Sequence, residues 1–150
     1  MFQGKFEHTL DDKGRLAIPS PIRRKLGGED QGETILMVTI SDQCLAAYPL
    51  LEWEQRLAMI ARLNQWDPRV MALKRIFVGC AQECPIDKAG RILIPNDLRR
   101  DARIERDCII LGQMEKVEFW SATRWQASFN QLTDQVGAVY AAVAGLGVQI

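Results

Sequence analysis

Apolar and polar residues alternate over residues 10–18 with the period of a β-strand, except at one break. Leu16 and Ile18 fall on one face of a strand by this alternation. The break is a three-residue loop at 12–14, where Gly14 occupies the position that needs a left-handed backbone. The pattern predicts a strand, a tight turn and a second strand, and it recurs in the second half of the chain.

A proline and a short helix follow each predicted turn. Pro19 and Pro95 end the second strands. Ser20 and Asn96 are residue types that favour the N-cap, and Gly27-Gly28 is typical of a helix end. We therefore expect two helices of about five residues each, at 22–26 and 98–102.

Longer apolar runs predict a second hairpin and an amphipathic helix in each half of the chain. The predicted strand pairs are 34–40 with 45–48, and 108–111 with 117–120. Apolar residues at helical spacing follow each pair, namely Trp53, Leu57, Ile60 and Ala61, then Trp125, Phe129 and Leu132. Asp67-Pro68 opens a connecting helix of about ten residues, which has no counterpart in the second half.

These elements belong to an internal repeat in which residues 11–25 return at 87–101. The identical positions are Asp11, Gly14, Arg15, Ile18, Pro19, Arg23 and Arg24, which recur as Asp87, Gly90, Arg91, Ile94, Pro95, Arg99 and Arg100. The predicted repeats span 5–51 and 80–123, with a helical connector at 52–79 and a C-terminal helix and tail at 124–150. One repeat alone buries little core. We expect an α+β fold in which two tandem hairpin and helix repeats form a pseudo-twofold pair around one barrel-like core, with peripheral helices.

Charge is informative only locally, because 19 basic and 19 acidic residues give a net charge of zero. Residues 11–25 carry five basic and two acidic side chains, and residues 87–103 carry five and three. No apolar run reaches the roughly 18–20 residues of a membrane helix, and residues 1–8 lack the apolar core of a signal peptide. We expect a cytoplasmic protein with no membrane partner.

The four cysteines do not have the spacing of a zinc site. Cys80 and Cys84 are further apart than the usual pair of zinc ligands, and Cys44 and Cys108 stand alone in apolar runs. The sequence predicts buried, reduced cysteines, and it predicts no metal and no cofactor.

Arg15 and Arg91 are the strongest candidates for binding chemistry, and the three arginines in each repeat point toward a polyanion as the ligand. A guanidinium fork fits the O6 and N7 edge of guanine, and a two-stranded ribbon can enter the major groove. Asp11 and Asp87 stand four residues before these arginines and could orient them. The alternative is that each Asp–Arg pair only holds its own turn together.

The neighbouring basic residues suit phosphate contacts. Lys13 and Lys88 lie in the predicted turns as point charges. Arg23-Arg24 and Arg99-Arg100 lie on the short helices, either as solvated helix faces or as a phosphate-binding flank. The lone His8 has no catalytic partner in the sequence, and no nucleotide-binding or nucleophile motif is present, so we expect neither an enzyme nor a small-molecule substrate.

The tandem Asp-x-x-x-Arg turns and proline-capped basic helices closely resemble the MraZ family, which is built from two swapped-hairpin repeats of the AbrB/SpoVT type. The resemblance covers MFQGKFEHTLDDKGRLAIP at the start, Tyr48-Pro49 to Trp53, and the second copy to Trp125. It implies a sequence-specific bacterial transcriptional regulator in which Arg15 and Arg91 contact DNA. It also implies short direct repeats upstream of the cell-division and cell-wall gene cluster as the target, nucleoid association and ring-shaped homo-oligomers.

Three other interpretations compete with this one. An antitoxin uses a similar hairpin on DNA, but usually has one copy and a disordered toxin-binding tail. A ring-forming structural protein could use the arginines in subunit contacts instead of DNA contacts. Self-processing decarboxylases have barrels of related shape, but their Gly-Ser cleavage site is absent from this sequence.

Overall fold

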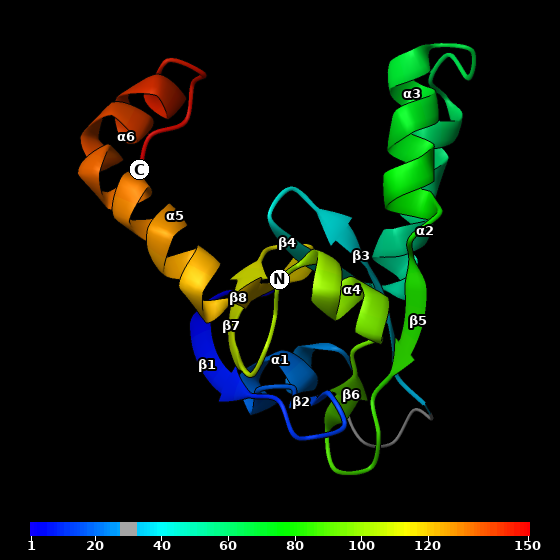
Figure 1. Ribbon diagram of the computed structural model, residues 1–150. Helices are drawn as coiled ribbons and strands as arrows, with labels where there is room; N and C mark the ends of the chain where they lie inside the picture. The colour runs from blue at the N-terminus through cyan, green and yellow to red at the C-terminus, as the bar shows by residue number, and fades with distance from the viewer. Residues whose placement is uncertain (28–32) are drawn as a thin grey trace.

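The computed structural model describes residues 1–27 and 33–150 and shows an α+β fold around a six-stranded antiparallel sheet (Figure 1). The strand order is β1 (Lys5–Thr9), β7 (Asp107–Gln113), β8 (Lys116–Ser121), β4 (Cys44–Pro49), β3 (Ile35–Ser41) and β5 (Gln82–Pro85). Two further strands, β2 (Arg15–Ala17) and β6 (Arg91–Leu93), pair with each other as a separate antiparallel ribbon. The predicted α+β class is confirmed.

The strands on either side of each predicted turn pair with the other half of the chain. β1 pairs with β7 rather than with β2, and β5 pairs with β3 rather than with β6. The interpretation of residues 10–18 as one two-stranded hairpin is therefore corrected. The turn forms, but its two strands enter different sheets, because the second strand must bury Leu16 against the shared core.

The pairing is symmetric between the two repeats. Exchanging β1 with β5, β3 with β7 and β4 with β8 reproduces the same sheet order read from the other end. One core cluster combines side chains from the sheet, the ribbon and the short helices, including Val38, Phe119, Leu16, Ile92, Ile22 and Leu98. The two repeats thus complete each other around a single core, as the repeated pattern predicts.

The short helices are α1 (Ser20–Lys25) and α4 (Asn96–Asp101). Pro19 and Pro95 occupy the N-cap positions, and no side chain caps either helix. The prediction of Ser20 and Asn96 as N-caps is therefore wrong: both lie in the first helical turn, where their oxygens accept hydrogen bonds from arginines. Gly28, also expected at the end of α1, lies outside the described residues.

Two helical arms project from the side of the sheet opposite the ribbon (Figure 1). One arm contains α2 (Leu50–Ala61), α3 (Pro68–Leu73) and the π-helix η1 (Lys74–Val78), and the other contains α5 (Ala122–Asp134) and α6 (Val136–Ala144). The apolar stripe predicted on α2 is buried at Trp53. The stripe on α5 is less covered, since Phe129 and Leu132 are 37% and 50% exposed.

The cysteines are free thiols with little exposure. Cys44, Cys84 and Cys108 are buried, and Cys80 is partly buried. Burial raises the pKa of the Cys108 thiol to about 12, so it stays protonated and unreactive. Residues 1–27 and 33–150 contain no group of three His, Cys, Asp or Glu side chains that could hold a metal. None of the helices in this part of the chain is long and apolar enough to cross a membrane.

Candidate nucleic-acid interface

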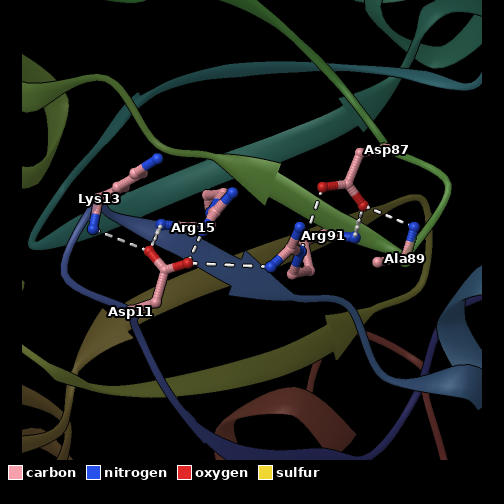
Figure 2. A network of polar contacts seen from close by, with 6 residues as sticks. All are labelled: Asp11, Lys13, Arg15, Asp87, Ala89 and Arg91. Carbon is pink, nitrogen blue, oxygen red and sulfur yellow. Dashed lines mark hydrogen bonds and ion pairs between the residues drawn. The ribbon is translucent and has the colours of Figure 1, made fainter.

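The β2–β6 ribbon places its two arginines on one outer face. Leu16 lies opposite Ile92 in the antiparallel register, and both side chains point into the core with 0% exposure. Strand alternation then turns Arg15 and Arg91 to the other face of the ribbon. Figure 2 shows the two arginines between Asp11 and Asp87, which approach from opposite ends of the ribbon.

Each turn is closed by backbone hydrogen bonds around a left-handed glycine. The amide of Gly14 donates to the carbonyl of Asp11 at 3.0 Å, and the amide of Asp11 donates to the carbonyl of Arg15 at 3.0 Å. The second turn has the equivalent bonds, and the φ angles of Gly14 and Gly90 are +82° and +78°. Only glycine adopts this conformation without strain, so the predicted role of these two glycines is confirmed.

The aspartates organise the turns and fix the arginines at the same time. Asp11 Oδ1 accepts hydrogen bonds from the amides of Lys13 and Arg15, both at 2.9 Å, and Asp11 Oδ2 accepts from Arg15 Nε at 2.5 Å. In the second repeat Asp87 makes the corresponding contacts, with Arg91 Nε at 3.1 Å (Figure 2). The same contacts therefore hold the arginine in position and stabilise the turn. The two roles considered for each Asp–Arg pair are compatible.

The same contacts keep both carboxylates ionised. The backbone amide of Arg15 is the main cause that lowers the pKa of Asp11 to about 2, with the Arg15 guanidinium also contributing. The pKa of Asp87 is lowered as well, chiefly by the amide of Arg91. At neutral pH each turn therefore holds a charged Asp–Arg pair. These side chains are about one third exposed or more, so solvent screens the attraction within each pair.

Pairing through Nε leaves the outer end of each arginine available. The terminal Nη atoms of Arg15 have no hydrogen-bond partner within residues 1–27 and 33–150. Arg91 differs slightly, because its Nη1 lies 3.9 Å from Asp11 Oδ2. Asp11 thus faces both arginines. Lys13 and Lys88 extend from the two turns and are exposed.

The adjacent arginines on α1 and α4 differ in their surroundings, although the sequence suggests that they are equivalent. Arg24 and Arg100 are exposed. Arg23 is partly buried, and it donates from Nε to the carbonyl of Ile18 and from Nη2 to Ser20 Oγ, both at 3.0 Å. Arg99 is also partly buried, and its Nη2 donates to Asn96 Oδ1. Nothing in the local sequence distinguishes the members of each pair except which one follows the buried Ile22 or Leu98.

The fold and the ribbon define a class of protein with two tandem swapped-hairpin repeats and one Asp–Arg turn in each. The profile of a family described as "MraZ protein, putative antitoxin-like" matches residues 1–76 and 77–137, one match for each repeat. The chain belongs to the MraZ family. The repeat boundaries expected from the sequence remain a prediction.

Curated relatives cover most of the chain. A protein of Mannheimia succiniciproducens named "Transcriptional regulator MraZ" is 42% identical over 131 residues, which are 87% of this chain and 86% of the relative. A protein of the same name from Pectobacterium carotovorum is 38% identical over 138 residues, which are 92% of this chain and 89% of the relative. The similarity therefore extends through both repeats and into the C-terminal arm.

Proposed function

We propose that this protein is a transcriptional regulator that binds double-stranded DNA sequence-specifically through the outer face of the β2–β6 ribbon. The observation that carries the proposal is the pair of arginines held by aspartates through Nε, with Arg15 Nη atoms that have no partner within residues 1–27 and 33–150 and can donate to a new one. The names of the curated relatives support the same function.

Arg15 and Arg91 read bases in this proposal. A two-stranded ribbon fits a major groove about 12 Å wide, and an arginine there can donate two hydrogen bonds to the O6 and N7 atoms of guanine. Asp11 and Asp87 reduce the conformational entropy that the arginines lose on binding, because the side chains are already held in position.

Phosphate contacts come from the exposed basic residues around the ribbon. Each Asp–Arg pair is neutral as a unit, so the positive charge needed for affinity comes from Lys13, Lys88, Arg24 and Arg100. Lys13 and Lys88 lie in the turns next to the base-reading arginines, and Arg24 and Arg100 lie on α1 and α4. We expect them to set the salt dependence of binding rather than its sequence preference.

A single chain with zero net charge should have a low affinity for DNA, and assembly into a ring-shaped homo-oligomer would compensate for this low affinity. Several ribbons at fixed spacing could engage short direct repeats together and gain avidity. We propose such repeats upstream of the cell-division and cell-wall gene cluster as the target, and association with the nucleoid as the result. A monomer with tight binding to a single repeat would contradict this part of the proposal.

The test compares Arg15→Ala with Arg62→Ala on the protein's own upstream DNA. Arg62 is exposed at the end of α2, in the arm on the other side of the sheet, and its loss removes the same charge. Arg15→Ala should weaken specific binding by about 10-fold or more per engaged site, whereas Arg62→Ala should bind normally. An Arg15→Ala protein that is folded and still protects the same DNA would overturn the base-reading role.

The structural-ring alternative makes a different prediction for the same variant. If Arg15 served subunit contacts alone, Arg15→Ala would reduce the mass measured by light scattering, and the unchanged protein would not bind DNA even at low salt. In the function proposed here the mass stays constant and only DNA binding is lost.

A further inference from the structure

We propose that Arg23 and Arg99 are positioning residues, each of which holds the arginine-bearing turn of the other repeat. The part of this inference that concerns DNA rests on the function proposed above. It assigns these two arginines a role different from that of Arg24 and Arg100, their neighbours on the same short helices.

The first observation is the contact between Arg23 and the second turn. A Cβ atom built on Gly90 would lie 2.6 Å from Arg23 Nη1 and 2.8 Å from Arg23 Cζ. Only a glycine allows the guanidinium to approach the backbone this closely. The bonds from Arg23 to Ile18 and Ser20 fix the side chain in this place, so the turn of repeat 2 lies against a side chain of repeat 1.

The second observation is the equivalent contact in the other direction. A Cβ atom on Gly14 would lie 2.7 Å from Arg99 Cζ and 3.0 Å from Arg99 Nε. Arg99 Nε is buried without a hydrogen-bond partner among the described residues. An arginine that was free to move would place its Nε–H in solvent, where water could accept the hydrogen bond. Packing against the turn, together with the bond to Asn96, keeps Arg99 there.

Backbone hydrogen bonds connect the same partners. The amide of Ile18 donates to the carbonyl of Gly90 at 2.9 Å, and the amide of Ile94 donates to the carbonyl of Gly14 at 3.1 Å. Each turn glycine therefore meets the other repeat twice, once through its carbonyl and once through a packed guanidinium. The turn that presents Lys88 and Arg91 is held in place by repeat 1, and the turn that presents Lys13 and Arg15 by repeat 2.

This geometry separates positioning from phosphate binding. Arg23 already uses Nε and Nη2 inside the protein, and its Nη1 lies against Gly90. A phosphate would therefore have to compete with these contacts for the Arg23 guanidinium. Arg24 is exposed and, among the described residues, makes one long bond, from Nε to the carbonyl of Ser20 at 3.4 Å, so it can reach a phosphate without disturbing these contacts.

The first experiment substitutes each of the two arginines by lysine and by alanine. Lysine keeps the charge but not the planar group, so Arg23→Lys should fail as Arg23→Ala does. Both should lower the melting temperature by about 3–6 °C and weaken specific binding by about 10-fold, with the salt slope unchanged. Arg24→Ala should leave the melting temperature unchanged and reduce by about 1 the salt slope, which is the slope of the logarithm of the binding constant against the logarithm of the salt concentration. Arg24→Lys should restore this slope.

The second experiment tests the contact with Gly90 itself. Gly90→Ala should lower the melting temperature more than Gly27→Ala, because Gly27 also has a positive φ, of +101°, but no atom of the described residues beyond its chain neighbours lies within 4 Å of its Cβ position. In the Arg23→Ala background the added methyl group meets no guanidinium. In that background Gly90→Ala should therefore lower the melting temperature only by the amount that backbone strain alone produces.

The third experiment tests whether the effect crosses between the repeats. Arg23→Ala and Arg91→Ala should be non-additive in DNA binding, whereas Arg23→Ala and Arg15→Ala should add. An Arg23→Lys protein with unchanged melting temperature and normal binding would overturn the inference, and so would coupling to Arg15 instead of Arg91. If the proposed function is wrong, the unchanged protein will not bind DNA. The positioning role of Arg23 and Arg99 is tested separately, because melting temperatures are measured without DNA.

Discussion

The two repeats are nearly equivalent on the ribbon side of the sheet and differ on the side of the helical arms. The turns, the short helices and the ribbon strands correspond residue by residue, and each turn contacts the opposite repeat. The helices that follow β4 and β8 pack mainly on their own repeat. The comparison indicates that elements shared across the pseudo-twofold axis are constrained by both repeats, while the arms are free to differ.

The arms differ in what covers their aromatic residues. Trp53 stacks on Phe77 of η1, with ring centres 5.0 Å apart, and also contacts Tyr48. Trp125 instead stacks on Phe129 of its own helix at 5.4 Å. The chain continues after α5 as α6, which supplies no aromatic partner to Trp125 among the described residues, and Phe129 and Leu132 remain partly exposed.

The largest expected effect concerns this difference between the arms. Trp53→Ala removes a buried ring from a three-ring cluster and should lower the free energy of unfolding by about 3–5 kcal/mol. Trp125→Ala should cost clearly less, because Trp125 is only partly buried. Urea unfolding of the two variants measures both values, and equal losses would show that the second arm is covered as completely as the first.

A smaller effect should distinguish the two aspartates. Asp11 Oδ2 lies 2.5 Å from Arg15 Nε and 3.9 Å from Arg91 Nη1, whereas within residues 1–27 and 33–150 Asp87 forms an ion pair with Arg91 alone, at 3.1 Å. Asp11→Asn should therefore reduce the ratio of specific to non-specific DNA binding more than Asp87→Asn, by about threefold. Fluorescence anisotropy with operator and scrambled DNA gives this ratio. If both variants only bound all DNA more tightly, the carboxylates would be repelling phosphate rather than orienting arginines.

The smallest effect should appear in the stability at low pH. The folded pKa of Asp11, about 2, lies below its ordinary value of 3.8, so this group stabilises the fold above about pH 4 and loses its contribution as the pH falls toward 2. Asp11→Asn should make the melting temperature less dependent on pH within that window and leave the slope above it unchanged. Asp87→Asn should act in the same direction and more weakly, because its ion pair is longer. Unchanged pH profiles in both variants would contradict the assigned contacts.

Local features of the fold follow from local sequence. The left-handed glycines, the outward arginines and the short helices could be predicted because each depends on a few neighbouring residues. The exchange of strands could not be derived from residues 10–18, since the pattern is the same whether β2 pairs with β1 or with β6; only the family resemblance implied it. The difference between Arg23 and Arg24 depends on Gly90, which is far along the chain. The exposure of Phe129 and Leu132 on α5 depends on how α6 packs beside it, which the local pattern does not show.

The exchange of strands also determines when the protein can fold during synthesis. Lys5 of β1 lies opposite Leu111 of β7, and Leu16 lies opposite Ile92, so most of the chain must leave the ribosome before either turn meets its partner. Contacts this distant in sequence form slowly, and unpaired strand edges are prone to aggregation while they wait. A nascent chain that stops before β7 presents β1 as an unpaired edge strand. The arrangement that joins the two repeats in the finished protein thus leaves the first half without its strand partners until the second half has been synthesised.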